Sequence, residues 1–505
     1  MERTARPSGP TTLLSSRWIE RAVLRVLVPI FLFVSLFLPP ASIGARLFHT
    51  EFALLTSGKG GFVSGPNGVY LRVPPGGLAK RSRVRVEAVA CGEQPDLRVG
   101  NPGFLASVGA AGDLFQTEPD AKQLLALEAM PGDQVVFSPL YRFDVRGEMP
   151  SESLVSIPVP YELSAVDQAD LYGWDGEAWH WVPSHATVDG LSLQSDMESL
   201  PSLLVVTQRQ PSSLRIGYGV SPVGSSPLSQ DVPLSYISVG GLHLQGEGGI
   251  GGQTADLGAM GSIGPARLLL SISNVVDGVV RSDLVDNLII NEGLTAAHIE
   301  HIVGLVQSGP WAGAEIAYLG VDPGLASELA TFLSQLADAL HQADKKLAVR
   351  VDPAKRGGDG WDTGAYDWRA VGKLADLVRI PALVEPTAYV PGGAMDAMLA
   401  WATGEVERDK IDLVVSTDSH DVSGTTITKV PYADALGLLA RHIQTDRPNG
   451  VVLPGEAVQL ALPDAQQMPL AYDDESQIYW FGYYDAQGRS HTVWLENGSS
   501  IVRKL

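Results

Sequence analysis

Titratable side chains occur at the ends of strand-like apolar runs, a position where barrel enzymes place functional groups. Glu315 lies within the run Gly313–Leu319, Glu385 closely follows a later run, and Asp418 and His420 follow the last one. A glutamate can donate a proton, and an Asp–His pair can serve as acid and base. Structural alternatives exist: Glu315 as a buried carboxylate held by an arginine or a backbone donor, and Asp418 as a turn residue. The candidate catalytic residues are therefore Glu315, Glu385, Asp418 and His420.

One tryptophan is a candidate for carbohydrate binding. Trp361 lies in a loop with Asp352, Asp359 and Asp362. An exposed indole can stack on a sugar ring, although packing in the core or the loop is the alternative. The sequence predicts no metal site and no cofactor. It lacks a cluster with zinc-type ligand spacing, and the glycine-rich run Gly246–Gly252 has no clear helix directly behind it.

The elements that would position these residues alternate between strand and helix after Leu214. Apolar runs predict strands at Leu214–Gly219, Tyr236–Leu244, Arg267–Ser273, Ala314–Leu319, Leu347–Val351, Val378–Leu383 and Ile411–Ser416. Helices are predicted at Ala296–Gln307, from the pair Asp322-Pro323 and from Asp367. This alternation predicts an α/β fold, a (β/α)8 TIM-type barrel over residues 214–505, with its site at the carboxyl ends of the strands.

Residues 48–210 follow a different pattern, with short strands separated by Gly and Pro. Strands are predicted at Val69–Val73, Val84–Ala88, Gln134–Val145, Leu154–Pro160 and Leu203–Thr207. Such a pattern is typical of an antiparallel β-sandwich. The segment Gly65–Leu78 resembles the opening of the β-sandwich of zonula-occludens and netrin-receptor proteins, and Asp170–Trp181 suits the same module. This resemblance implies an adhesive or spacing unit without chemistry of its own.

Several segments of the barrel region carry a second resemblance. Tyr236–Gly248, Leu268–Asn274, Gly313–Leu319 and Tyr366–Asp376 resemble the second, third and fourth strands, and the helix before the sixth strand, of family 18 glycoside hydrolases. The similarity is to the branch of spore-germination and cortical-fragment hydrolases. It implies the barrel fold and a site that handles amino sugar polymers.

The acidic signature of that family is largely missing. Its fourth-strand motif, Asp-Gly-x-Asp-x-Asp-x-Glu, places its four acidic positions on Ala312, Glu315, Ala317 and Leu319. Only Glu315 is a carboxylate, and Leu319 stands where the resemblance implies the proton donor. The sixth-strand Tyr and Asp are likewise replaced by Leu383 and Val384. The family uses the acetamido group of the substrate as nucleophile, and loss of a general acid costs about 10²–10⁴-fold in rate.

The resemblance therefore implies a hydrolase-like barrel that binds a β-1,4-linked amino sugar polymer, chitin-like or peptidoglycan, and has lost hydrolysis. The predicted carbohydrate-binding residues are Trp361, Asn274, Glu385 and Asp418. Two alternatives stay open. One is an active glycosidase with a relocated acid, Glu315 or Glu385; the other is a structural or protein-binding scaffold.

The N-terminus predicts export. Five arginines precede the apolar run Val26–Leu38, and small residues follow as far as Ala45, which is the pattern of a signal peptide. Residues 1–45 are thus predicted to be a signal peptide or, if uncleaved, a membrane anchor. The protein would then be extracytoplasmic, secreted or anchored at the cell surface. A net charge of −21 argues against nucleic acid as a partner, and the single Cys91 excludes an intramolecular disulfide.

The C-terminal segment predicts a hairpin and a last helix. Tyr479–Leu495 predicts a hairpin that turns at Asp485–Gly488, and Glu496–Leu505 predicts the helix. In the family, the eighth strand would come next. We therefore favour the interpretation that the barrel is a fragment lacking its last strand; the alternative is that the barrel closes in some other way.

Overall fold

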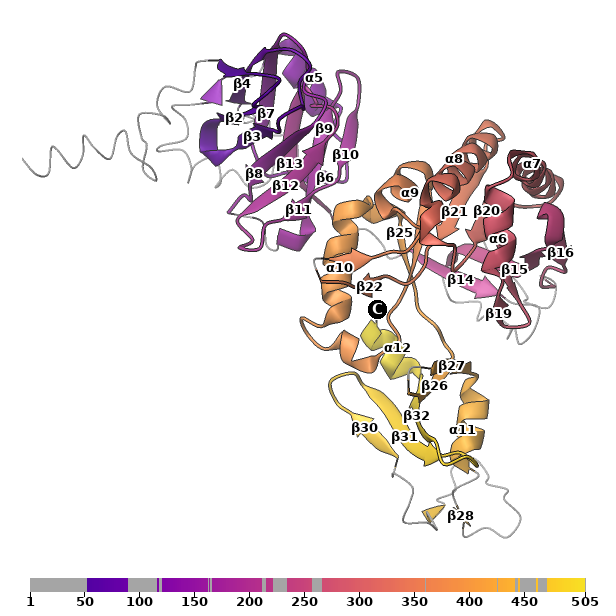
Figure 1. Cartoon of the computed structure of the whole chain (residues 1–505). Coiled ribbons are helices and arrows are strands. Elements are labelled where there is room, and N and C mark those ends of the chain that lie inside the picture. The colour runs from indigo at the N-terminus through magenta and orange to yellow at the C-terminus, as the bar shows by residue number, and fades with distance from the viewer. Residues whose placement is uncertain are drawn as a thin grey trace, which may run out of the picture. The chain divides into compact units, whose positions relative to one another are not determined.

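The computed structural model of the chain describes residues 52–89, 116–117, 120–161, 163, 166–210, 215–220, 234–256, 266–358, 360–424, 426–440, 444–445, 460–461 and 470–504. It contains two compact units, Met1–Ser212 and Ser213–Leu505 (Figure 1). The predicted export segment and Cys91 lie outside the described residues. Among the helices that are described, none is long and apolar enough to cross a membrane.

Two sheets form the N-terminal unit. The first has the order β1 (Ala53–Leu55), β4 (Ser82–Val89), β7 (Leu140–Arg146), β13 (Leu203–Arg209), β9 (Ala169–Trp174) and β10 (Trp179–Val182), with β5 (Gln116–Thr117) beside β4 and β6 (Gln134–Val136) beside β13. The second has the order β11 (His185–Ala186), β12 (Ser192–Met197), β8 (Ser153–Pro158), β3 (Tyr70–Val73) and β2 (Gly61–Ser64). Leu71 and Val155 of the second sheet are buried in one cluster with Val84 and Leu204 of the first. The two sheets therefore share an apolar core.

Helical elements of this unit are few. They are η2 (Pro66–Gly68), α5 (Ala121–Glu128) and η3 (Val166–Gln168). Helix α5 begins at a capping box, in which the Asp120 side chain accepts from the Gln123 N–H and the Gln123 side chain accepts from the Asp120 N–H. The prediction of one continuous strand over Gln134–Val145 is wrong. The chain forms two strands there, β6 and β7, with a break around Pro139, which has no N–H to donate to a neighbouring strand.

Seven parallel strands form the centre of the C-terminal unit. In chain order, which is also their order in the sheet, they are β14 (Ile216–Val220), β15 (Leu234–Leu244), β17 (Arg267–Ser273), β20 (Gly313–Ala317), β21 (Lys346–Arg350), β24 (Leu377–Pro381) and β25 (Ile411–Val414). Strand β16 (Ile250–Gly252) pairs antiparallel with β15. The seven predicted strands are confirmed, with ends that shift by at most two residues. Within the described ranges no pair joins β25 to β14, so the sheet does not close there.

Helices that connect the strands cover the outer face of the sheet (Figure 1). They are α6 (Ser282–Ile289), α7 (Glu292–Ser308), α8 (Ala326–Gln342), α9 (Trp368–Leu374) and α10 (Ala394–Glu405), with short turns η4 (Gly246–Gly248), η6 (Pro323–Leu325), η7 (Pro386–Tyr389) and η8 (Arg408–Lys410). The predicted helix from Asp322-Pro323 begins with the tight turn η6 before α8, and Leu329, Leu333, Leu336 and Leu340 of α8 are buried. Asp367 caps α9, as predicted, by accepting from the Ala370 N–H at 3.0 Å.

Contacts across the inner face show that the sheet is curled. Arg379 of β24 donates from Nη1 to Ser238 Oγ of β15 at 2.6 Å. These strands are four places apart in the sheet order, which is about 19 Å in a flat sheet. An arginine cannot span that distance, so the face that carries Arg379 must be concave.

A smaller sheet follows β25. Its order is β27 (Thr426–Val430), β26 (Ser419–Ser423), β32 (Ser490–Leu495), β31 (Ile478–Tyr484) and β30 (Ala471–Asp473). Helix α11 (Tyr432–Ala440) packs on one face through Ala435 and Leu439. The predicted hairpin is β31–β32 and the predicted last helix is α12 (Gly498–Lys504), so both are confirmed. Two-residue strand pairs complete the unit: β18 (Val275–Val276) with β19 (Val279–Val280), β22 (Lys355–Arg356) with β23 (Trp361–Asp362), and β28 (Gln444–Thr445) with β29 (Leu460–Ala461).

Candidate functional site

Glu315 lies inside the curled sheet, in an ion pair. Its side chain is buried, and Oε2 accepts from Arg379 Nη1 at 2.7 Å. Asp412 of β25 is also near, with Oδ2 at 3.9 Å from Arg379 Nε. Burial raises the pKa of Asp412, while the positive charges of Arg379 and Arg215 lower it. A general acid has to donate a proton, whereas the guanidinium holds Glu315 as an acceptor, so this geometry favours a structural role.

Leu319, two residues beyond β20, occupies the position that the resemblance gives to the proton donor. It is half-buried. Asn274 holds its backbone from both sides: Nδ2 donates to the Leu319 carbonyl at 2.8 Å, and the Leu319 N–H donates to Oδ1 at 2.8 Å. Asn274 itself is completely buried. Its contact with a sugar stays a prediction. In this structure its amide group fixes the backbone just beyond the end of β20.

Asp352 is the carboxylate beside Leu319. It follows β21, and its two oxygens accept from the Gly320 N–H at 3.0 and 3.1 Å. Burial raises its pKa, while the Gly320 hydrogen bond and the charge of Lys355 lower it. The sequence analysis placed Asp352 only in a loop around Trp361. The signal that could have identified it is its position directly after a strand, at the same edge as the end of β20.

Trp361 and Glu385 lie at the same edge of the sheet, on different segments. Trp361 is in the β22–β23 hairpin, and its indole is half-buried against the helical core. Glu385 is exposed immediately before η7. Glu385 also acts on Tyr389 of η7. Burial is the largest cause of the raised pKa of Tyr389, and the negative charges of Glu496 and Glu385 raise it as well. Both candidates therefore keep some access to solvent at the carboxyl ends of the strands.

Asp418 and His420 are not brought together as an acid–base pair. His420 lies in β26, is 2% exposed, and neither ring nitrogen has a hydrogen-bond partner among the described residues. Its nearest carboxylate is that of Glu496, with Oε1 at 4.0 Å from Nδ1. Burial lowers the pKa of His420, although the charge of Glu496 raises it. Asp418 is half-buried and acts on His420 only as a more distant charge.

The C-terminal helix secures this part of the unit. Glu496 is buried, accepts from Ser500 Oγ at 2.8 Å and forms an ion pair with Lys504. Arg503 donates from Nη2 to the Tyr389 carbonyl at 2.7 Å. Helix α12 thus connects the small sheet to η7 of the parallel-sheet region.

One cross-strand row places aromatic and basic residues on the same face of the small sheet. Neighbouring Cα partners run in the order Lys429, His420, Trp494, Trp480 and Ala471. Side chains of directly paired residues point to the same face. Trp480 and Trp494 are half-buried. The sequence analysis missed this row because it depends on the pairing of five strands.

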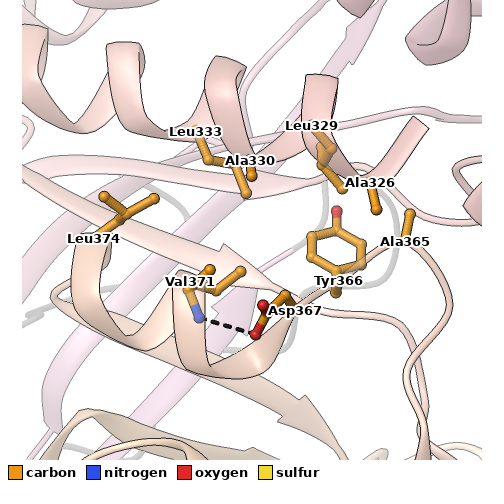
Figure 2. A pocket seen from close by; sticks show the side chains of 10 residues that line it. Ala326, Leu329, Ala330, Leu333, Ala365, Tyr366, Asp367, Val371 and Leu374 are labelled. Carbon is orange, nitrogen blue, oxygen red and sulfur yellow. Dashed lines mark hydrogen bonds between the residues drawn. The ribbon is translucent and has the colours of Figure 1, made fainter. Parts of the chain in front are cut away.

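Two hollows lie in the helical layer, away from the strand ends. Figure 2 shows one between α8 and α9, lined by apolar side chains such as Leu329, Leu333 and Val371, with Tyr366 at its edge. Its volume of about 10 Å³ has room for about one water. The second, about 670 Å³, lies between α7 and α8 and is lined mostly by Ala, Gly and Gln. Neither contains a predicted site residue.

Comparison with known proteins gives relatives for part of the chain. No family model matches the chain. It is 26% identical over 280 residues to YdhD of Bacillus subtilis, provisionally described as a sporulation-specific glycosylase, covering 54% of this chain and 62% of that protein. It is 27% identical over 183 residues to the cortical fragment-lytic enzyme of Bacillus subtilis, covering 34% of this chain and 38% of that enzyme. The chain thus spans less than two thirds of the length of the curated relatives it matches.

Solved structures of the same kind align more weakly. The crystal structure of YdhD has a TM-score of 0.41 at 23% identity, covering 54% of this chain and 87% of that chain. A chitinase of Chromobacterium violaceum has a TM-score of 0.39 at 22% identity, covering 53% and 80%. The relationship therefore rests on the sequence matches. They confirm that the chain is similar to the predicted branch of glycosylases and cortex-lytic enzymes.

Proposed function

We propose that this chain is an exported cell-surface protein whose hydrolase-like barrel binds a β-1,4-linked amino sugar polymer without cleaving it. Its curated relatives are described as a glycosylase and as cortical fragment-lytic enzymes, which supports a glycan ligand. The observation that carries the loss of cleavage is the pairing of Glu315 with Arg379, because Leu319 replaces the expected donor and Glu315 is the only carboxylate left of the motif. The polymer is chitin-like or peptidoglycan.

The binding surface in this proposal is the edge formed by the carboxyl ends of the parallel strands. Trp361 stacks on a sugar ring there, and Glu385 and Asp418 accept from sugar hydroxyls. Asn274 contributes by holding the backbone of Leu319 in place. All these side chains belong to the C-terminal unit, Ser213–Leu505.

We assign the remaining regions as follows. Residues 1–45 are a signal peptide or an uncleaved anchor. Residues 48–210 are a β-sandwich of the zonula-occludens and netrin-receptor type, which spaces or attaches the barrel. The two sheets with a common core support this assignment.

Cosedimentation tests the binding half of the proposal. The full chain is mixed with insoluble chitin and, separately, with peptidoglycan, and the bound fraction is measured for wild type, Trp361→Ala and Asp418→Asn. We expect binding to at least one polymer and weaker binding by both variants. Glu300→Gln, on α7 in the helical layer, is the matched control and should bind as wild type does. Equal binding by all four proteins would contradict the placement of the site, and absence of binding would favour the scaffold alternative.

One observation favours a second candidate, an active glycosidase with a relocated acid. Asp352 lies beside Leu319, and burial raises its pKa, which is the environment a general acid needs. Here Asp352 takes the role that the sequence suggested for Glu315 or Glu385. Release of reducing ends that persists in Glu315→Gln and Glu385→Gln but falls about 10²-fold or more in Asp352→Asn would establish this alternative.

A further inference from the structure

An exposed pair of aromatic rings lies on the outer face of the second sheet of the N-terminal unit. Phe62 of β2 and Tyr70 of β3 have ring centroids 5.1 Å apart and ring planes inclined by 32°. Phe62 is 57% exposed, and Tyr70 is half-buried. A single exposed apolar residue is normal on a protein surface, but two adjacent rings form a larger apolar surface whose exposure to water is unfavourable.

Strand pairing shows that both rings point away from the core. Leu71, between Tyr70 and Arg72 in β3, is 0% exposed and belongs to the core shared by the two sheets. Because successive side chains of a strand point to opposite faces, Tyr70 and Arg72 lie on the outer face. Phe62 pairs with Arg72 across β2 and β3 and therefore lies on that face too.

The outer face of the first sheet, by contrast, buries its aromatic residues. Trp174 and Trp179 are only 5% and 8% exposed, in a cluster with Ala126 and Leu127 of α5. Trp179 also donates from Nε1 to the Ala126 carbonyl at 2.6 Å. The chain thus covers aromatic side chains of one outer face with its own helix and leaves those of the other in contact with solvent.

Polar groups accompany the two rings in two cross-strand rows. One row runs in the order His185, Gln194, Ser156, Tyr70 and Ser64, and the neighbouring row in the order Asp196, Leu154, Arg72 and Phe62. Gln194 donates from Nε2 to the Tyr70 hydroxyl at 3.0 Å, which orients the ring and leaves the phenol proton for another acceptor. Arg72 and Asp196 are exposed, on strands two places apart in the sheet and so about 10 Å from each other.

This combination fits a sugar better than an apolar protein segment. A pyranose ring presents C–H groups on its face, which pack on an aromatic ring, and hydroxyl groups at its rim, which need both donors and acceptors. The Tyr70 phenol and the Arg72 guanidinium are donors, and the Asp196 carboxylate is an acceptor. The curated relatives of the chain are described as a glycosylase and as cortical fragment-lytic enzymes, which favours a glycan among ligands with this chemistry.

We propose that Phe62 and Tyr70 form a glycan-binding platform, and that the N-terminal unit itself binds the β-1,4-linked amino sugar polymer. One sugar ring stacks on the two aromatic rings, and the polymer continues along the sheet toward Arg72 and Asp196, which bind its hydroxyl and acetamido groups. The inference rests on the proposed function for the identity of the polymer. It goes beyond that function by giving residues 48–210 a binding site of their own.

Hydroxyl-radical footprinting of the full chain tests this site directly. The protein is oxidised alone, with a saturating hexasaccharide of N-acetylglucosamine, and with a saturating tetrasaccharide of alternating N-acetylglucosamine and N-acetylmuramic acid, and oxidation is quantified residue by residue. We expect at least one sugar to slow the oxidation of Phe62 and Tyr70, and the comparison distinguishes a chitin-like polymer from peptidoglycan. Tyr161, which is 93% exposed and lies in neither row, is the internal reference and should be oxidised at an unchanged rate.

Variants measure the contribution of stacking. In a Trp361→Ala background, which removes the aromatic group of the other proposed site, Phe62→Ala should weaken binding of the protecting sugar about fivefold or more. Phe62→Trp should bind at least as tightly as the parent, because it keeps an aromatic surface. Leu54→Ala, on β1 of the first sheet, is the matched control, since Leu54 is 58% exposed, and it should bind as the parent does. A loss that Leu54→Ala shares would contradict the assigned position.

The outcomes separate this inference from the proposed function. Protection of Trp361 without protection of Phe62 and Tyr70 would overturn the platform and leave the barrel site standing. Protection of Phe62 and Tyr70 without Trp361 would support the platform and contradict the placement of the barrel site. If neither sugar protects either place, both proposals fail. These comparisons use wild-type protein, so they decide the question even if Phe62→Ala folds poorly.

Discussion

Acidification should destabilise the C-terminal unit through His298. This histidine is on α7 and is 1% exposed. Its Nδ1 lies 2.7 Å from the Gly248 carbonyl, and its Nε2 lies 2.6 Å from the hydroxyl of Tyr318. A carbonyl only accepts, so Nδ1 carries the proton, and the neutral ring then accepts from Tyr318 at Nε2. Protonation of Nε2 would reverse this bond, because the Tyr318 hydroxyl would have to turn its proton away and accept from the ring.

The magnitude follows from the pKa. The pKa of His298 is lowered from 6.5 to about 4. Burial is the largest cause, the charge of His301 also lowers the pKa, and the Gly248 hydrogen bond opposes both. The unfolded chain therefore binds more protons than the folded one between these values. Stability is fully present above about pH 6.5 and is lost as the pH falls toward 4. The loss attributable to His298 is about 3 kcal/mol.

Denaturant unfolding of the full chain between pH 7.5 and 4 measures this loss. Hydrogen exchange of peptides from α7 and β20 assigns it to the C-terminal unit. His298→Gln removes the titrating group, so its stability should fall less than that of wild type over this range, by about 3 kcal/mol. Glu300→Gln, an exposed position on the same helix, is the control and should follow wild type closely. Parallel pH profiles for wild type and His298→Gln would refute the reasoning.

Three further predictions concern other buried or partly buried charges. Glu315→Gln should cost up to about 3–5 kcal/mol in the free energy of unfolding, because the buried Arg379 loses its close counter-charge and keeps only the more distant Asp412. Adding Arg379→Met should restore part of this loss, and no recovery would contradict the pairing. Lys504→Met should cost about 3 kcal/mol or more in the free energy of unfolding, because the carboxylate of Glu496, which is 0% exposed, loses its ion-pair partner. Amide hydrogen exchange should become faster in α12 and β32 and stay unchanged in α8. Asp352→Asn should leave glycan binding within about twofold of wild type, because the amide oxygen still accepts from the Gly320 N–H; a large loss in a binding titration would show that its charge contacts the ligand.

The alternation of strands and helices in the C-terminal unit could be predicted because each element carries its own signal. The strand Arg267–Ser273 is an apolar run with the predicted bounds, and α8 places its leucines at helical spacing on one buried face. Helix ends were predictable where a side chain caps them locally, as Asp367 does for α9. All these features are encoded within a few neighbouring residues.

The candidate site was harder to predict because its contacts join distant segments. Glu315 could be placed on the inner face from strand parity, but its partner Arg379 is 64 residues away on a strand that is two places removed in the sheet. His420 was expected to act with its neighbour Asp418, and strand pairing instead buried it beside Glu496.

The most direct test of the central claim measures binding and cleavage on the same sample. The full chain is incubated with insoluble peptidoglycan at a concentration that saturates the polymer, the bound protein is quantified, and the supernatant is assayed for new reducing ends over one day. The account predicts saturable binding with no reducing ends above those released by polymer alone. Reducing ends that increase with bound protein, and disappear in Asp352→Asn, would contradict it and establish an active glycosidase.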